Sequence, residues 1–140
     1  MSSDVYTGGT FDLFHSGHVR LLARCRDLAG GGLVWVGLNT DEFVTEYKGH
    51  PPVISFAGRM EVLAACRYVD RVIPNFGGRD SKPAILEAQP DLIVVGSDWT
   101  NRNYDEQLDV TPEWLAKRGI EVLYTPYTEG ISSSQIREAL

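Results

Sequence analysis

GGTFDLFHSGH, residues 8–18, joins an apolar run at residues 5–8 to a helical pattern over residues 18–29. The first run predicts a short β-strand that ends in glycine, and the second places apolar side chains at helical spacing. Glycine lets the backbone approach a ligand closely, and the free N–H groups at a helix N-terminus attract anions. The stretch therefore predicts an anion-binding turn between the first strand and the first helix.

Apolar runs alternate with helical patterns along the remainder of the chain. Further strands are predicted at 33–38, 71–74, 91–96 and 121–124, and further helices at 56–68, 82–88, 112–118 and 132–140. Such alternation is typical of a parallel sheet covered on both faces. We expect one doubly wound, Rossmann-like α/β domain over residues 1–140, with a five-stranded, mainly parallel sheet and its ligand outside the carboxyl ends of the strands. Residues 47–56 are predicted to form a mobile loop.

Composition limits the possible partners. The 140 residues are 43% hydrophobic and 23% charged, and 13 Lys and Arg against 19 Asp and Glu give a net charge of −6. This balance argues against a nucleic-acid binder or a protein of the membrane surface. No segment approaches the roughly 20 apolar residues that span a bilayer, and the N-terminus has no targeting pattern. Two cysteines, Cys25 and Cys66, cannot form a disulfide framework. We expect a soluble, cytoplasmic protein.

His15 and His18 are the first candidates for catalysis. A helical start places both imidazoles on one side of the helix N-terminus, where they suit a phosphate that gains charge in a transition state. The same spacing also fits a surface pair or part of a metal site. Structural zinc is disfavoured because no thiolate is near and Asp12 is the only adjacent carboxylate. Asp12 itself fits either a helix-entry cap or a carboxylate that faces a metal.

The motif is neither GxGxxG nor GxxxxGK[ST], which disfavours a dinucleotide dehydrogenase and a P-loop enzyme. Residues 9–18, GTFDLFHSGH, resemble instead the GTFDxxHxGH signature of the cytidylyltransferase group of nucleotidyltransferases, and within it the glycerol-3-phosphate cytidylyltransferases. The resemblance covers nearly the whole chain in the same order. It includes TDEF at 40–43, RYVD at 67–70, GSDW at 96–99 in place of GDDW, and TEGISSS at 128–134 in place of TEGISTT.

The resemblance implies a role for each matching residue. His15 and His18 stabilise charge at the α-phosphate of the nucleotide, and Lys48 closes over the triphosphate or the substrate phosphate. Arg59 grips a substrate phosphate. Mg²⁺ bridges the triphosphate, with Asp12 as the candidate protein ligand, and residues 67–70 contribute to a homodimer. The implied nucleotide-binding residues are Gly9, Thr10, Phe11, His18, Asp98, Trp99, Ile131, Ser132, Ser133 and Ser134.

Each of these residues also has a purely structural explanation. Arg59 could pair with Glu61 or Glu42 on a solvated helix face, and Lys48 could be an ordinary loop lysine. The serines at 132–134 could merely cap the last helix. Trp99 could lie at the edge of the core. Arg67 and Asp70 could form a surface charge pair.

Two departures from the family pattern bear on the choice of nucleotide. Tyr127 stands where the family commonly has arginine before TEGIS, and Arg137 is the candidate substitute for that guanidinium. Residues 131–137, ISSSQIR, are similar to the ISSTxIR motif of several adenylyltransferases in the same superfamily. Ser97 replaces the first acidic residue of GDDW. The whole-chain resemblance favours CTP, and these departures favour ATP.

The function implied is transfer of CMP from CTP to a small phosphorylated acceptor, with glycerol 3-phosphate as the named acceptor and pyrophosphate as the leaving group. The enzyme alternative is an adenylyltransferase that uses ATP with a sugar phosphate or another phosphorylated acceptor. The alternative of another class is a nucleotide-binding module that has lost catalysis through Tyr127. Intact His15 and His18 argue against that module, because binding alone has less need of both imidazoles.

Overall fold

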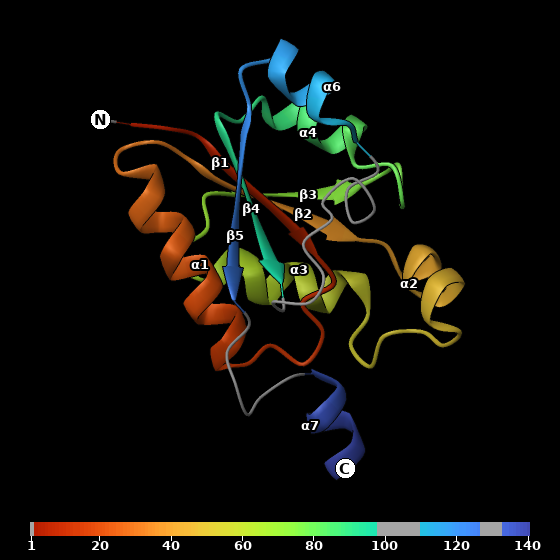
Figure 1. Cartoon of the computed structure of the whole chain (residues 1–140). Helices are drawn as coiled ribbons and strands as arrows, with labels where there is room; N and C mark the ends of the chain where they lie inside the picture. The colour runs from red at the N-terminus through yellow and green to blue at the C-terminus, as the bar shows by residue number, and fades with distance from the viewer. Residues whose placement is uncertain (1, 98–109, 127–132) are drawn as a thin grey trace.

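The computed structural model describes residues 2–97, 110–126 and 133–140. Five parallel strands form one sheet in the order β3-β2-β1-β4-β5, drawn as arrows in Figure 1. The expected doubly wound α/β fold is thereby confirmed. The strands are β1 (Val5–Gly9), β2 (Val34–Asn39), β3 (Arg71–Asn75), β4 (Leu92–Ser97) and β5 (Glu121–Pro126).

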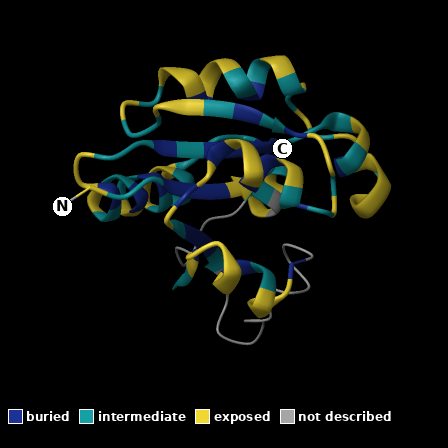
Figure 2. Ribbon diagram, turned by 90° about the horizontal axis from the view of Figure 1, so that it is seen from above, coloured by how far each residue is buried: buried dark blue, intermediate teal, exposed yellow. Residues whose placement is uncertain are grey.

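Helices cover both faces of the sheet and its carboxyl edge. Residues of α1 and α3 pack with the sheet in clusters on one face, and residues of α4 and α6 pack in a cluster on the other. Burial accordingly follows the strands and the inner sides of the helices (Figure 2). The described helices are α1 (Ser16–Ala29), α2 (Asp41–Lys48), α3 (Phe56–Ala65), α4 (Lys82–Ala88), α6 (Pro112–Lys117) and α7 (Ser133–Ala139).

Successive residues of β1 pack against the helices on opposite faces of the sheet. Val5 packs in the α1 cluster, whereas Tyr6 points to the opposite face and joins the cluster of α4 and α6. Both side chains are fully buried, as alternation along a strand covered on both faces requires. A β-carbon on Gly37 of β2 would overlap the Tyr6 hydroxyl group. Glycine at this position therefore makes room for the tyrosine.

One helix departs from the sequence prediction. Residues 41–48 form α2, so Lys48 is the last residue of a helix and does not lie in the loop predicted over 47–56. The Thr40 hydroxyl accepts the N–H of Phe43 at 3.2 Å, and Gly49 ends the helix with φ of 82°. An N-cap threonine before two acidic residues and a glycine after the last turn were the signals that predict this helix.

The sheet opens at the carboxyl end of β1. β1 and β2 stay in register over the five residues Val5–Gly9, but β1 and β4 pair only at Val5 and Tyr6. The two strands separate beyond that point, where the order of the sheet reverses direction. Such a switch point is where doubly wound sheets bind their ligands.

The charge pair between Arg67 and Asp70, the structural alternative to a role of residues 67–70 in a dimer, does not form. The Asp70 carboxylate accepts from Arg26 at 2.8 Å and from the N–H of Val34 at 2.7 Å, which ties it to α1 and β2. Arg67 donates to the hydroxyl of Tyr68 at 3.1 Å. Asp70 therefore anchors the start of the neighbouring strand.

Two expectations from composition can be compared directly with the structure. Cys25 and Cys66 are both free, and Cys25 is buried. Within the described ranges, every helix is too short or too polar to cross a membrane.

Candidate active site

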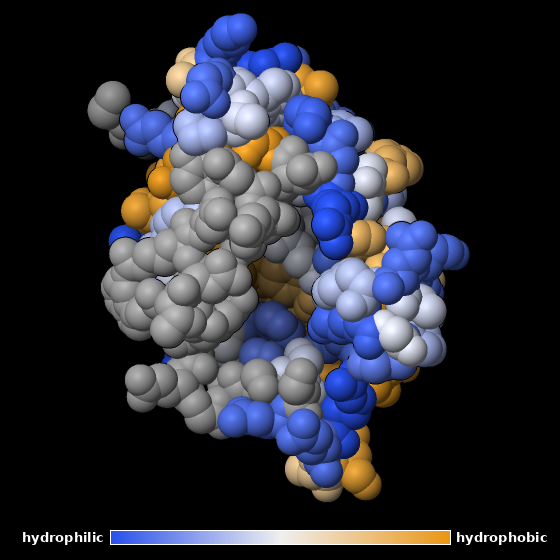
Figure 3. Space-filling model, turned by 45° about the vertical axis from the view of Figure 1, so that its right-hand side comes forward, coloured by the Kyte–Doolittle hydropathy of each residue, from blue (hydrophilic) through white to orange (hydrophobic). Residues whose placement is uncertain are grey.

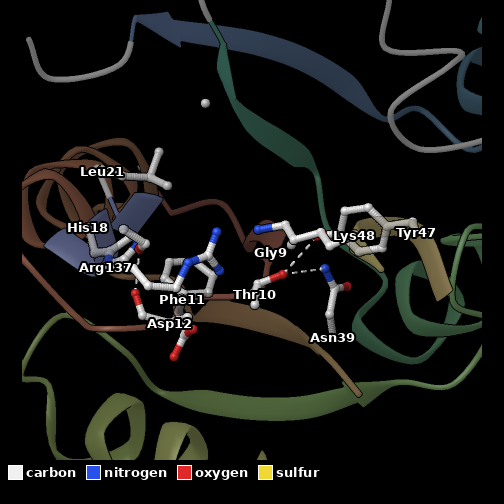
Figure 4. Close-up of a pocket in the computed structure, with 13 residues that line it drawn as sticks. Gly9, Thr10, Phe11, Asp12, His18, Leu21, Asn39, Tyr47, Lys48 and Arg137 are labelled. Atoms are coloured by element: carbon white, nitrogen blue, oxygen red, sulfur yellow. Dashed lines mark hydrogen bonds between the residues drawn. The ribbon is translucent and has the colours of Figure 1, made fainter. Parts of the chain in front are cut away.

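A cavity of about 320 Å³ lies at the carboxyl ends of β1, β2 and β4, between α2 and α7. It is the hollow in the surface of Figure 3, and its walls are drawn in Figure 4. The walls combine glycine backbone, two cations, one carboxylate, several neutral polar groups and two apolar side chains. They are formed by Gly8, Gly9, Thr10, Phe11, Asp12, His18, Leu21, Asn39, Tyr47, Lys48, Gly96, Ser133 and Arg137.

The turn between β1 and α1 carries unusual backbone. Phe11 and Leu13 both have φ near +50°, a left-handed conformation that non-glycine residues rarely adopt. Such backbone costs of order 1 kcal/mol or more per residue and persists only where the surroundings hold it. Two buried charged side chains, Asp12 and Arg59, supply that support.

Asp12 ties this turn to the segment that precedes α3. Its carboxylate accepts the N–H groups of Val53 at 2.7 Å and Ile54 at 2.9 Å, and the N–H of Leu13 at 3.1 Å. The residue is only 7% exposed, although it contributes to the cavity wall. Backbone donors thus engage both carboxylate oxygens. In the described part of the chain, no three His, Cys, Asp or Glu residues gather closely enough to hold a metal ion.

Arg59 lies beneath the turn and outside the cavity wall. Its guanidinium donates to the carbonyl oxygens of Thr10 at 2.8 Å, Asn39 at 2.9 Å and Ile54 at 2.9 Å, and it forms a 2.6 Å salt bridge with Asp41. With 1% of its surface exposed, Arg59 has no face open to a ligand. The structure therefore replaces the expected phosphate contact with a positioning role, and the pairing carboxylate is Asp41 instead of Glu61 or Glu42.

His15 and His18 form a reciprocal cap at the start of α1. The Nδ1 of His15 accepts the N–H of Gly17 at 3.0 Å, and the Nδ1 of His18 accepts the N–H of His15 at 3.2 Å. The rings stack with their centroids 3.8 Å apart. Because each Nδ1 is an acceptor, each neutral ring carries its proton on Nε2. His18 lines the cavity, whereas His15 lies against the His18 ring, outside the cavity wall.

Both imidazoles are held neutral. Burial lowers the pKa of His18 to about 4, and the neighbouring His15 adds to this effect against the opposing charge of Asp12. Burial also lowers the pKa of His15. At neutral pH the pair therefore offers N–H donors without positive charge, and these can stabilise an anion that develops at the cavity wall.

A row of hydrogen bonds crosses the carboxyl edge of the sheet. Asn75 at the end of β3 donates to Oδ1 of Asn39 at the end of β2, across 3.0 Å. Asn39 in turn donates to the Thr10 hydroxyl at 3.0 Å, which meets the Tyr47 hydroxyl at 3.1 Å. The dashed lines of Figure 4 mark the last two bonds. These hydrogen bonds hold the Thr10 side chain in a fixed orientation just after the carboxyl end of β1.

Two cations reach the cavity from opposite sides. Lys48 comes from the end of α2, and Arg137 comes from α7 (Figure 4). Arg137 also donates to Nδ1 of His50 across 3.3 Å. Neither cation forms a salt bridge with a carboxylate among the described residues. The cavity therefore offers positive charge to an anionic ligand.

The last helix is attached directly to the turn. The Ser133 hydroxyl donates to the backbone carbonyl of Asp12, and Ser133 lines the cavity. Ser134 follows it in the first turn of α7. Residues from the two ends of the chain thus meet at one site.

The structure gathers most of those predicted site residues that it describes. Of the site residues predicted from sequence, those lining the cavity are Gly9, Thr10, Phe11, Asp12, His18, Lys48 and Ser133. The candidates Asp98, Trp99, Ile131 and Ser132, with the side chain of Ser134, lie outside the described residues. Asn39 and Tyr47 also line the cavity, although the sequence did not predict them as site residues. Asn39 had a usable signal, because it ends the strand next to β1 at the edge where ligands bind.

Comparison with known proteins places this geometry in a family. A family model described as "Cytidylyltransferase-like" matches residues 6–139. The chain belongs to the cytidylyltransferase-like family. The resemblance noted in the sequence is thereby confirmed, and the cavity with His18 and Lys48 lies within the part of the chain that the family covers.

Relatives that match over nearly their whole length include enzymes whose names state different reactions. The chain is 38% identical over 136 residues to the glycerol-3-phosphate cytidylyltransferase of Bacillus subtilis, covering 97% of this chain and 95% of that protein. It is 33% identical to the FAD synthase of Korarchaeum cryptofilum over 145 residues, covering 100% of this chain and 93% of that one. Among solved structures, a lipopolysaccharide core biosynthesis protein from Thermoplasma volcanium superposes with a TM-score of 0.68 at 25% identity, over 89% of this chain and 95% of that chain.

Proposed function

We propose that the protein transfers CMP from CTP to a small phosphorylated acceptor, glycerol 3-phosphate by its similarity to the Bacillus subtilis relative. The observation that carries the proposal is the position of His18. Its neutral ring lines a cavity at the switch point of the sheet, and Lys48 and Arg137 bring positive charge to the same cavity. Two substrates that carry phosphate suit this combination of N–H donor and cations.

The chemistry needs no covalent intermediate on the protein. An oxygen of the acceptor phosphate attacks the α-phosphorus of CTP, and the bond from that phosphorus to the bridging oxygen breaks. Pyrophosphate leaves with the bonding electrons, and the product carries a new P–O–P linkage. The Nε2–H of His18 donates to an α-phosphate oxygen as charge accumulates there, while Lys48 and Arg137 position the phosphates.

We propose that Mg²⁺ enters with the triphosphate. Mg²⁺ commonly keeps several waters and binds through substrate phosphates with one or two carboxylates. Asp12 is the carboxylate in the described cavity wall, and backbone N–H groups occupy both of its oxygens. The described residues therefore fit a metal carried by the substrate better than one held by the protein, and the metal neutralises phosphate charge when it is bound.

The adenylyltransferase alternative rests on a specific observation. Arg137, the last residue of the motif that is similar to ISSTxIR, lines the cavity, and a full-length relative is a FAD synthase. Equal concentrations of CTP and ATP with glycerol 3-phosphate, followed by mass spectrometry of the products, separate the two alternatives. We expect the CMP-linked product, and a predominantly AMP-linked product would overturn the choice of CTP. The absence of Mg²⁺-dependent pyrophosphate release with every nucleotide would favour a binding module without catalysis.

We also propose a homodimer. Val62 on α3 is exposed, and the exposed Arg67 stacks over the Tyr68 ring at 5.0 Å just after that helix. Apolar and aromatic groups beside arginine are typical of interface composition. Sedimentation of the purified protein tests the proposal, and a single monomeric species at micromolar concentration would contradict it.

A further inference from the structure

The cavity has two chemically different halves. On the side of β4 and α7 it is lined by Gly96, Leu21, His18, Ser133 and Arg137. On the side of β2 and α2 it is lined by Asn39, Tyr47 and Lys48, and Thr10 lies between them and Gly9 (Figure 4). A transfer between two substrates needs both of them in one cavity, on either side of the reacting phosphorus.

The switch point of the sheet indicates which half of the cavity binds the nucleotide and which binds the acceptor. The opening lies between the separated ends of β1 and β4, where a doubly wound sheet receives its nucleotide. His18 marks the place of the α-phosphate under the proposed function. The half beside β2 therefore remains for the acceptor, and Lys48 is the cation that meets its phosphate.

Tyr47 is an exposed polar group in that half whose hydroxyl can change its hydrogen-bond partner. The residue is 46% exposed, and its hydroxyl contacts Thr10 at the open end of the hydrogen-bonded row. The ring packs on Phe43 with centroids 4.8 Å apart, and Lys48 Nζ lies 5.7 Å from its centroid. The ring is therefore held on α2 while the hydroxyl can exchange Thr10 for another oxygen.

Asn39 and Thr10 have less freedom. Asn39 uses its oxygen on Asn75 and its nitrogen on Thr10, and Asn75 is buried. The hydrogen bond from Asn39 therefore fixes the Thr10 hydroxyl on one side. The other side of that hydroxyl contacts, among the described residues, only the hydroxyl of Tyr47. A substrate hydroxyl that enters between these two hydroxyl groups finds a donor and an acceptor on each side.

We propose that Tyr47 is a specificity-determining residue that recognises a hydroxyl group of the acceptor, so that the site selects a hydroxylated alkyl phosphate over a plain alkyl phosphate. The inference rests on the proposed function and extends it to the acceptor class. In the empty protein, Thr10 occupies the hydrogen bond that the acceptor hydroxyl takes in the complex. An acceptor that lacks the hydroxyl leaves Thr10 and Tyr47 paired with each other and gains no hydrogen bond from them, so it should be the poorer substrate.

Competition between two acceptors tests the inference. Glycerol 3-phosphate and an excess of propyl phosphate are mixed with CTP and Mg²⁺, and mass spectrometry of the two products gives the ratio of their kcat/KM values. We expect the wild type to favour glycerol 3-phosphate, and Tyr47→Phe to lower the ratio about tenfold, the effect of one lost hydrogen bond. The KM for glycerol 3-phosphate should rise more than the KM for CTP.

Tyr68→Phe is the matched control. It removes a phenol hydroxyl that contacts Arg67 outside the cavity wall, and it should leave the product ratio as in the wild type. An unchanged ratio in Tyr47→Phe, with the wild type active, would overturn the inference alone. A wild type that transfers CMP to neither acceptor would overturn the proposed function, and the inference with it. Circular dichroism of each variant verifies the fold.

Discussion

The backbone N–H of His15 donates to Nδ1 of His18, and the two rings stack with centroids 3.8 Å apart. The bond performs two tasks at once. It satisfies a donor at the start of α1, which an N-terminal cap must do, and it fixes the tautomer of the imidazole that lines the cavity. A residue of the catalytic wall is thus also part of the helix cap.

Substitution of His18 can separate these two tasks. Alanine removes both the cap and the Nε2–H donor, whereas asparagine retains an acceptor near the position of Nδ1. We expect both His18→Ala and His18→Asn to lower kcat by a factor on the order of 10²–10³, with less than about tenfold loss of nucleotide binding. The alanine variant alone should also lose about 1 kcal/mol of unfolding free energy.

Steady-state kinetics, nucleotide titration and urea denaturation measure these quantities. Near-normal kcat in either variant would contradict the role assigned to His18. Equal stability of the two variants would contradict the role of Nδ1 in the cap.

The lowered pKa of His18 predicts a pH dependence of stability. Its pKa is about 4 in the folded protein and 6.5 without burial, so the unfolded chain binds more protons between these values. The free energy of unfolding should therefore fall as the pH drops from 6.5 towards 4, and this contribution should be constant above 6.5. His18→Asn should weaken the dependence, while the lowered pKa of His15 preserves part of it. Urea denaturation at pH 7.5 and pH 5 compares the two proteins, and equal losses in both would contradict the assignment.

Asp12→Asn tests whether Asp12 holds the backbone or the metal. An amide cannot accept at both positions, so a bond to Val53 or Ile54 is lost. We expect a loss of about 1–3 kcal/mol in unfolding free energy and an unchanged Mg²⁺ concentration at half-maximal activity. A rise of tenfold or more in the Mg²⁺ requirement, with normal stability, would instead identify Asp12 as a metal ligand.

Arg59→Ala should affect stability before it affects substrate binding. The substitution leaves the Asp41 carboxylate and three backbone carbonyls without the guanidinium donor. The Asp41 side chain is 38% exposed and can be rehydrated, so the loss comes mainly from the carbonyl groups and should be about 1–3 kcal/mol. Lys82→Ala, at a salt bridge with Asp80 in which both side chains are more than a third exposed, is the matched control and should cost about 1 kcal/mol or less. A stable Arg59→Ala protein with a raised KM would restore the phosphate contact expected from sequence.

The parts of the site that sequence predicted are those in which local pattern and position agree. The glycine-ended strand placed Thr10 and His18 at the edge where ligands bind, and the family resemblance placed the serines of α7 at the same site. The place of the histidines follows from their spacing at a helix terminus, whereas the roles of Thr10 and the serines follow from the resemblance to the family.

Local sequence pattern could not predict the contacts of Asp12 and Arg59 or the position of Tyr47. Asp12 bonds to residues 41 and 42 positions away, and Arg59 bonds to Thr10 across 49 positions. No periodicity records such contacts, because they depend on how α3 docks against the turn. Tyr47 was placed in a loop because helix α2 was missed, which hid its position beside Lys48 on the cavity wall.

Both peptide groups around Ile54 are fixed: Asp12 accepts the N–H of Val53 and of Ile54, and Arg59 donates to the Ile54 carbonyl. The segment from Val53 to Arg59 consequently has one permissible length, since an added residue would move either the guanidinium or the carboxylate from its partners. Residues 49–52 carry no such constraint from Asp12 or Arg59. In the evolution of this family, insertions and deletions should therefore collect just after α2 and spare the approach to α3.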